Sequence, residues 1–157
     1  MKKRGASTAS LLGVLIVGLL IGAAVTYVAA PSLVSSGPTS LCNGQTITIG
    51  ALNDLSGGLS VQGQGELAAE QLAIQDVNSY LTTSGCKLTF ALNNQDYRLD
   101  NPTALSELQT FHSDGIQVVV GPLNSGTAAA LLSYADSNHI VMISPSSTSQ
   151  ALAIPND

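Results

Sequence analysis

The sequence has no tryptophan, two histidines and two cysteines. It contains no CxxC pair and no cluster of cysteines and histidines, the ligand patterns of structural zinc sites. Neither His112 nor His139 has a partner in the sequence pattern for nucleophilic or metal chemistry. We therefore expect no metal, no cofactor and no enzymatic activity.

Basic residues are scarce beyond the N-terminus. After Arg4, the sequence contains only Lys87 and Arg98 as basic residues. These two stand against all 10 acidic residues, which gives the region after residue 30 a formal charge of −8. Nucleic-acid binding requires basic patches, so this function is excluded, and the acidity is explained by solubility.

One long hydrophobic run contrasts with this polar composition. Residues 11–30 contain no charged or amide side chain and follow three basic residues at 2–4. At about 1.5 Å per residue the run reaches roughly 30 Å, the thickness of a bilayer's hydrocarbon core. The positive-inside tendency keeps residues 1–10 in the cytoplasm and exports the rest. We expect a single-pass membrane anchor, with a cleaved signal segment and a secreted product as the alternative.

Residues 31–45 are predicted to be a linker, because serine, glycine and proline are frequent in them. Cys42 and Cys86 lie shortly before the first and second expected strands. Consecutive parallel strands often neighbour each other, so both cysteines would lie at one edge of the sheet. A disulfide there would close a loop of about 44 residues and contribute roughly 3–4 kcal/mol. Two free thiols are the alternative.

Residues 46–157 alternate between strand and helix patterns. Short β-branched runs predict strands at 46–52, 87–92, 116–120 and 140–143. Helical spacing predicts helices at 64–81, at 101–114 and at 127–137. The alternation predicts an α/β fold with a mainly parallel, doubly wound sheet in the order β-α-β-α-β-α-β.

Each predicted helix has an apolar face that we expect to be buried. The first carries Ala69, Leu72, Ala73, Val77 and Tyr80, the second Ala104, Leu105, Leu108, Phe111 and His112, and the third Ala128, Leu131, Leu132 and Ala135.

Polar loops are expected where the parallel strands end, which is where such sheets bind ligands. Asp54 and Asp96 lie in two of these loops, and we favour loop capping or solvent exposure over a catalytic pair. The glycines around Gly57 and Gly63 lack both the GxGxxG spacing and the lysine of a phosphate-binding loop. A nucleotide site is therefore not expected.

Three segments carry a family resemblance. They are residues 49–59 with the helix start that follows, residues 119–126 (VVGPLNSG) and residues 141–148 (VMISPSST). In this order they resemble the first, third and fourth strands, with their loops, of type I periplasmic binding proteins, in particular the leucine/branched-chain amino-acid-binding group of ABC transporters. The resemblance covers residues 46–157. It implies a two-lobed receptor that closes on a small ligand.

The resemblance also implies that the chain holds only the first part of the N-terminal lobe. A doubly wound sheet usually continues beyond four strands, so we expect a fragment whose folding alone is marginal.

Site residues follow from the same resemblance. It implies that Ser125 meets the α-carboxylate of the ligand and that Ser146 and Thr148 contact the ligand from the next loop. Gln62 matches a position near the ligand side chain that is often aromatic, which puts a leucine-like specificity in doubt. Asn124, beside Ser125, completes the predicted site.

The chemistry of these residues agrees with an anion site. Ser125 begins a predicted helix, where free N–H groups and the helix dipole favour an anion, and the hydroxyls of Ser146 and Thr148 add donors without a competing negative charge. The alternative is structural: helix capping by Asn124 or Ser125, and turn hydrogen bonds made by Ser146 and Ser147.

These features predict the extracellular solute-binding component of an ABC transporter for an amino acid or similar small carboxylate. It would work with an ABC permease and be held at the membrane through residues 11–30. The alternative is the ligand-binding sensor domain of a membrane receptor.

Overall fold

The computed structural model describes residues 41–153, and the fold belongs to the unit that begins at Asn43. The predicted cytoplasmic segment 1–10, the predicted anchor 11–30 and most of the predicted linker lie outside these residues. Among the residues that are described, no helix is both long and apolar enough to cross a bilayer.

Four strands alternate with three α-helices, as predicted. The elements are β1 (Thr46–Asn53), α2 (Ser60–Thr83), β2 (Thr89–Asp96), α3 (Asn101–Ser113), β3 (Val118–Val120), α4 (Ser125–Ser137), β4 (Val141–Ile143) and a short 3-10 helix, η2 (Gln150–Leu152). The main differences in boundaries are that α2 is longer at both ends and that β2 begins later and continues to Asp96.

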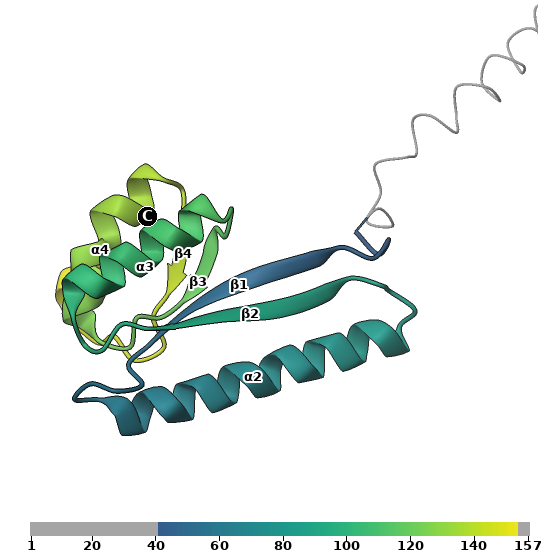
Figure 1. The fold of residues 1–157 in the computed structure, drawn as a ribbon, viewed down its shortest axis with the longest axis horizontal. Coiled ribbons are helices and arrows are strands. Elements are labelled where there is room, and N and C mark those ends of the chain that lie inside the picture. Colours follow the sequence, from purple (N-terminus) through teal and green to yellow (C-terminus); the bar gives the residue numbers. More distant parts are fainter. Residues whose placement is uncertain (1–40, 154–157) are drawn as a thin grey trace, which may run out of the picture. The chain divides into compact units, whose positions relative to one another are not determined.

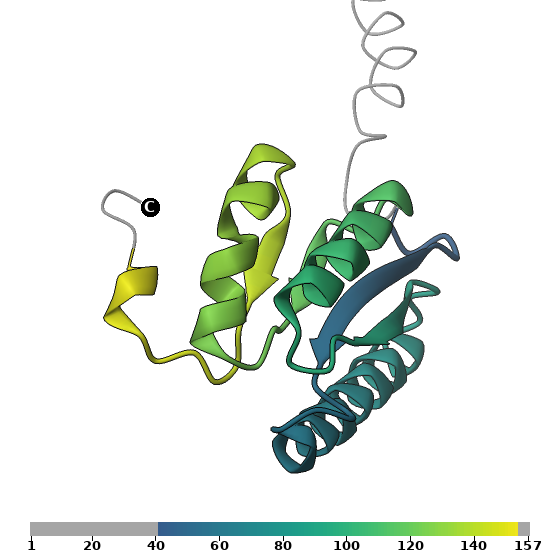
Figure 2. The ribbon, with the colours of Figure 1, turned by 60° about the vertical axis from the view of Figure 1, so that its left-hand side comes forward.

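All strand pairs are parallel, and the strand order is β2-β1-β3-β4. Asn53 pairs with Asp96 at the carboxyl ends of β1 and β2, and Val120 pairs with Ile143 at those of β3 and β4. α2 covers β1 and β2 on one face, whereas α3 and α4 cover the other (Figures 1 and 2). The predicted parallel α/β sheet with helices on both faces is confirmed.

The main core lies between the sheet and the α3–α4 pair. Its fully buried members include Leu52 and Val119 from the sheet, Leu108 and Phe111 from α3, and Leu131 from α4. Phe111 packs directly on Gly50 of β1, where an added Cβ would lie 2.9 Å from the ring. A larger residue at position 50 would therefore displace the ring.

The buried faces predicted for α3 and α4 are largely confirmed. Ala104, Leu108 and Phe111 are buried in α3, and Ala128, Leu131 and Ala135 in α4. The half-buried His112 approaches the Tyr134 hydroxyl with its Nδ1 at 3.2 Å, which links the two helices.

The buried stripe predicted for α2 is confirmed only in part, because Val77 is half-buried whereas its other members are exposed. Leu72 and Tyr80 are 57% and 70% exposed, and Ala69 and Ala73 are also exposed. Ala69, Ala73 and Val77 border an apolar hollow between α2 and the sheet, together with Ile49 and Phe90. The half-buried residues of the helix also include Glu66 and Glu70, which make hydrogen bonds to other elements. Apolar spacing did not predict this polar part of the face because it gives polar contacts no weight.

Asn78 provides one of these polar contacts. Its side chain donates to the carbonyl of Phe90 at 2.9 Å and accepts from the N–H of Phe90 at 2.7 Å. β2 is an edge strand, so Asn78 pairs backbone groups that no neighbouring strand takes up.

Cys42 and Cys86 are both disulfide-bonded, so the predicted disulfide is confirmed.

Candidate functional site

The candidate site lies at the carboxyl edge of the sheet, where the loops after β1, β2, β3 and β4 converge. The loop after β1 is organised by Asp54, which is fully buried. Its carboxylate accepts the N–H of Gly57 at 2.6 Å and that of Leu59 at 2.7 Å. These bonds close the turn that leads into α2.

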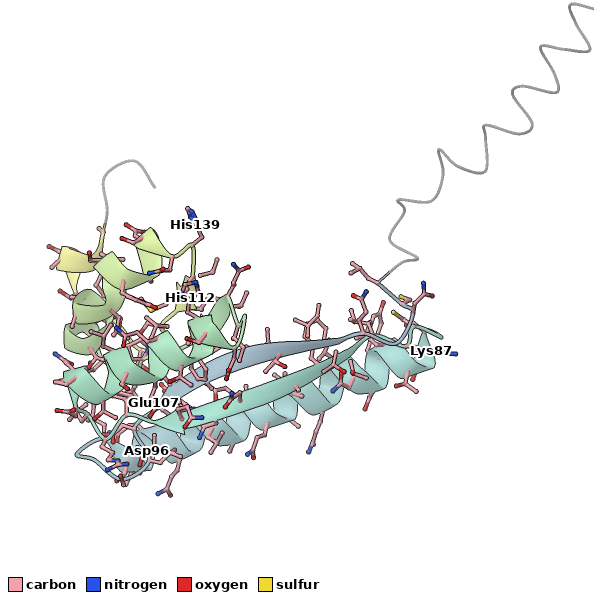
Figure 3. The ribbon with its side chains drawn as sticks, turned by 45° about the horizontal axis from the view of Figure 1, so that its top comes forward. Lys87, Asp96, Glu107, His112 and His139 are labelled. Atoms are coloured by element: carbon pink, nitrogen blue, oxygen red, sulfur yellow. The ribbon has the colours of Figure 1, made fainter. Side chains whose placement is uncertain are left out.

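Asp96, at the end of β2, holds the same loop from the neighbouring strand. Its carboxylate accepts the N–H of Leu55 at 2.9 Å and the hydroxyl of Ser56 at 2.5 Å. Burial alone would raise the pKa of the Asp96 carboxyl group. Hydrogen bonds from the Ser56 hydroxyl and from the backbone N–H groups of Leu55 and Arg98 outweigh this effect, so the pKa is lowered. Asp54 and Asp96 are therefore loop-capping residues, as the sequence analysis favoured. Figure 3 shows Asp96 at this end of the sheet and Lys87 at the opposite end.

Close packing brings the start of α2 against the end of β1. Gly63 is the one buried residue of α2, and an added Cβ there would lie 2.1 Å from the Asp54 carbonyl oxygen. Because the glycine permits this approach, residues further along α2 reach the carboxyl edge of the sheet. Glu66, one turn on, contacts Ser146, and Glu70, two turns on, contacts Asn53.

Ser125 and Thr148 meet at the N-terminus of α4. The Ser125 hydroxyl oxygen accepts the N–H of Thr148 at 3.1 Å and that of Ser149 at 3.3 Å. Asn124 is the N-cap of α4, and its side chain accepts the N–H of Thr127 at 2.8 Å. The structure thus brings Ser125 and Thr148 together and gives Asn124 a capping role.

The loop after β4 has a second fixed point. Ser144 donates to the carbonyl of Pro122 at 2.5 Å and shares a hydrogen bond with Ser147 at 2.5 Å. Ser146 donates to Glu66 Oε1 of α2 at 2.6 Å, across 80 residues of sequence. The hydroxyl of Ser146 is therefore engaged by a carboxylate, contrary to the expectation that no negative charge competes there. Gln62 is exposed, one turn before Glu66 on the same helix.

Sequence analysis missed two residues of this region, Glu66 and Tyr97. Tyr97, directly after β2, is fully buried, and the N–H groups of Leu123 and Asn124 lie near its hydroxyl without forming well-aligned hydrogen bonds. Burial and the nearby charge of Asp54 raise its pKa, and Glu66 adds to this, while the N–H groups of Leu123 and Asn124 act in the opposite direction. The only sequence signals of Glu66 and Tyr97 are that Glu66 follows Gln62 by about one turn and that Tyr97 comes directly after the residues of β2.

A second polar cluster lies beneath the loops. Asn53 is fully buried and donates through Nδ2 to Glu70 Oε2 and to Asn94 Oδ1, each at 2.8 Å. Burial raises the pKa of Glu70, the hydrogen bond from Asn53 opposes this, and the charge of Glu66 adds to the increase. The carboxylates of Glu66 and Glu70 on α2 are therefore close enough for their charges to interact.

Comparison with known proteins gives a consistent result. The family described as periplasmic binding protein matches residues 46–156. An uncharacterised protein of Methanocaldococcus jannaschii is 37% identical over 102 residues, covering 65% of this chain and 24% of its own length.

Two solved structures extend this comparison. The branched-chain amino acid transporter substrate binding protein LivJ of Streptococcus pneumoniae, in complex with isoleucine, aligns with a TM-score of 0.61 at 28% identity. An ABC transporter substrate-binding protein of Desulfitobacterium hafniense, in complex with leucine, aligns with a TM-score of 0.54 at 26% identity. Each alignment covers 69% of this chain and 31% of the solved one. The matched part of the chain thus spans 24% to 31% of the length of these three proteins.

Proposed function

The chain belongs to the periplasmic binding protein family, and on this premise we propose that it contributes to the solute-binding component of an ABC transporter. The proposed ligand is an amino acid or a similar small carboxylate, bound at the loops after β3 and β4. The observation that carries the proposal is the contact of Ser125 with the N–H groups of Thr148 and Ser149. This contact holds the loops after β3 and β4, which are the two candidate ligand-binding loops, against each other at the N-terminus of α4.

The N-terminus of α4 suits a carboxylate on physical grounds. The first N–H groups of a helix have no intrahelical partner, and the Asn124 side chain takes up only that of Thr127. The remaining N–H groups and the positive end of the helix dipole favour an anion. The Ser125 hydroxyl accepts two N–H groups with its oxygen and keeps its own proton for donation to a ligand.

The solved relatives support an amino acid as the ligand class, since the two compared here are complexes with isoleucine and leucine. The amino acid ligands of the relatives do not define which ligand side chain this protein prefers. The exposed amide of Gln62 stands at a position near the ligand side chain that is often aromatic. The described loops approach a ligand from one side. In a two-lobed receptor a second lobe closes over the ligand and removes it from water.

The proposal includes export and an ABC permease as partner. Residues 11–30 would hold the domain at the outer face of the membrane. Expression of the whole chain in a bacterial host tests this anchor. We expect the protein to resist alkaline extraction and to keep its N-terminal residues, as measured by mass. A mature product that begins near residue 31 would show that residues 11–30 are a cleaved signal and not an anchor.

Binding is tested by NMR titration of the whole chain with a panel of amino acids. Because the described contacts come from one side, we expect dissociation constants on the order of millimolar, equivalent to about 4 kcal/mol. Ser125→Ala and Thr148→Ala should each weaken binding at least about fivefold. Ser133→Ala, an exposed serine of α4, is the matched control and should bind as the wild type does. Unchanged affinity in both site variants would remove the carboxylate hypothesis.

A further inference from the structure

Tyr97 has a fixed place at the carboxyl edge of the sheet, directly after β2. Its backbone N–H donates to the Asn53 carbonyl at 3.0 Å, and its carbonyl accepts the N–H of Asp100 at 2.8 Å. Its side chain is fully buried and belongs to the hydrophobic core, whose members also include Leu52 and Phe111. The ring is therefore held by packing, and the backbone is held by hydrogen bonds to β1 and to the N-cap of α3.

The hydroxyl group is the part of Tyr97 that the core does not require. It is removed from water, and within residues 41–153 it makes no well-aligned hydrogen bond, although the N–H groups of Leu123 and Asn124 lie near its oxygen. Burial of a hydroxyl without a full hydrogen bond costs free energy, and a phenylalanine ring would fill the same space without this cost. The hydroxyl is therefore explained better by its two backbone neighbours than by the packing of the core.

The two N–H groups near this oxygen belong to the segment that leads into α4. Asn124 is the N-cap of the helix. Its carbonyl accepts the N–H of Ala128 at 3.0 Å, and its side chain accepts that of Thr127 at 2.8 Å. The N–H of an N-cap residue has no partner inside its own helix. The Tyr97 oxygen thus lies beside the peptide groups directly before Ser125.

A second contact joins the same part of the chain to α4. Asn101, the first residue of α3, accepts the hydroxyl of the buried Thr127 with its Oδ1 at 2.7 Å. Ser125, two residues before Thr127, accepts the N–H of Thr148 from the loop after β4. The start of α4 is therefore contacted both by residues 97–101 and by a candidate ligand-binding loop, so a change at Tyr97 can reach that loop through Ser125.

We propose that Tyr97 is a positioning residue for the ligand's carboxylate. Its hydroxyl oxygen attracts the N–H groups of Leu123 and Asn124 together and so fixes the direction of Ser125 and of the first turn of α4. The inference rests on the proposed function, because it places the carboxylate at the N-terminus of α4. Tyr97 is itself buried and does not touch the ligand, so it acts through the loop after β3.

The test uses Tyr97→Phe, which removes the hydroxyl and keeps the ring. L-leucine, L-isoleucine and acetate are titrated by NMR into the whole chain and into the variant. At least one of them should bind to the wild type, and Tyr97→Phe should weaken that binding about fivefold, because Ser125 loses its orientation. The midpoint of urea denaturation should stay the same or rise, since the lost hydroxyl is buried without a well-aligned hydrogen bond to any described residue.

Tyr134→Phe is the matched control, because it removes a tyrosine hydroxyl from α4 itself. That hydroxyl lies 3.2 Å from His112 Nδ1, away from the N-terminus of the helix. The control should therefore leave ligand binding unchanged, and any loss that it causes should appear in the urea midpoint.

A double variant tests whether Tyr97 acts through Ser125. If the two side chains act as a unit, Tyr97→Phe should weaken binding less in the Ser125→Ala background than in the wild type. Independent contributions would multiply instead, and that result would overturn the positioning role.

The remaining outcomes separate the inference from the proposed function. Equal affinity of folded Tyr97→Phe and the wild type would overturn the role of Tyr97 and leave the carboxylate site in place. A urea midpoint that falls together with the affinity, or a variant that does not fold, would assign the hydroxyl to the fold and overturn the inference as well. Absence of any wild-type response to all three compounds would overturn the proposed function, and this inference with it.

Discussion

Ser125 and Thr148 are joined by a hydrogen bond of 3.1 Å in which the Ser125 hydroxyl oxygen accepts the N–H of Thr148. The contact connects the first residue of α4 to the loop that follows β4. One side chain therefore contributes both to the position of that loop and to the chemistry offered at the helix N-terminus.

The first prediction concerns this contact and the loop. Ser125→Ala removes the acceptor for the N–H groups of Thr148 and Ser149 and should lower the free energy of unfolding by about 1 kcal/mol. Amide hydrogen exchange should become faster at these two residues in particular. Unchanged exchange at both would show that the loop is held by Ser144 and Ser146 alone.

The second prediction concerns the close approach of α2 to β1. Gly63→Ala places a Cβ 2.1 Å from the Asp54 carbonyl oxygen, and we expect a loss of about 3 kcal/mol in the free energy of unfolding. Gly65→Ala is the matched control, because nothing lies within 4 Å of its added Cβ. It should stabilise the helix by about 0.5–1 kcal/mol. Equal effects of the two substitutions in urea denaturation would contradict the packing described here.

The third prediction concerns Glu70 and pH. Its pKa is raised in the folded protein, so the folded state holds a proton more tightly than the unfolded state. The contribution of Glu70 to stability is therefore fully present below the unfolded pKa of 4.5 and is lost as the pH rises through the folded pKa. Glu70→Gln removes this pH-dependent loss of stability. It also offers an amide donor to Asn53 Oδ1, which has no hydrogen-bond partner among the residues that the structure describes.

We expect Glu70→Gln to unfold with a free energy about 1 kcal/mol higher than the wild type at pH 7. The difference should shrink as the pH falls below 4.5, where wild-type Glu70 is protonated in both states. Denaturation at a series of pH values measures it. A difference that grows toward low pH would have the wrong sign for a buried carboxyl group.

The fourth prediction concerns the open edge of β2. Asn78→Ala removes both hydrogen bonds to the Phe90 backbone and should cost about 1–2 kcal/mol of unfolding free energy, with faster amide exchange at Phe90. Ser79→Ala, at an exposed neighbouring position of α2, controls for the substitution itself. Equal stability of the two variants would mean that water replaces the amide at this edge without loss.

Much of the fold could be predicted because its signals are local. The β-branched runs around Ile49, Val119 and Val141 form strands, and Asp100 caps α3 by accepting the N–H of Thr103 at 2.9 Å. The apolar faces of α3 and α4 point as predicted, since two helices and a sheet surround that core. The inward face of α2 was predicted only in part, because it also depends on polar partners that lie far away in sequence.

The predicted site likewise contains some residues that could be located from neighbouring residues and others that could not. Ser125 and Asn124 could be located at a helix start from their neighbours alone. The partner of Ser146 could not, because Glu66 is 80 residues earlier and on a helix whose facing side the sequence did not reveal. Tyr97 likewise became visible only once its burial was known.

The sequence by itself determined the order of strands and helices along the chain, the parallel sheet and the loops that carry the serines and threonines. These follow from short-range periodicity, capping and turn chemistry, which neighbouring residues decide. The tertiary structure alone decided that α2 turns its carboxylates toward the sheet and that Glu66 reaches Ser146. Those contacts join distant segments, and their energies depend on burial and charge, which exist only after the chain has folded.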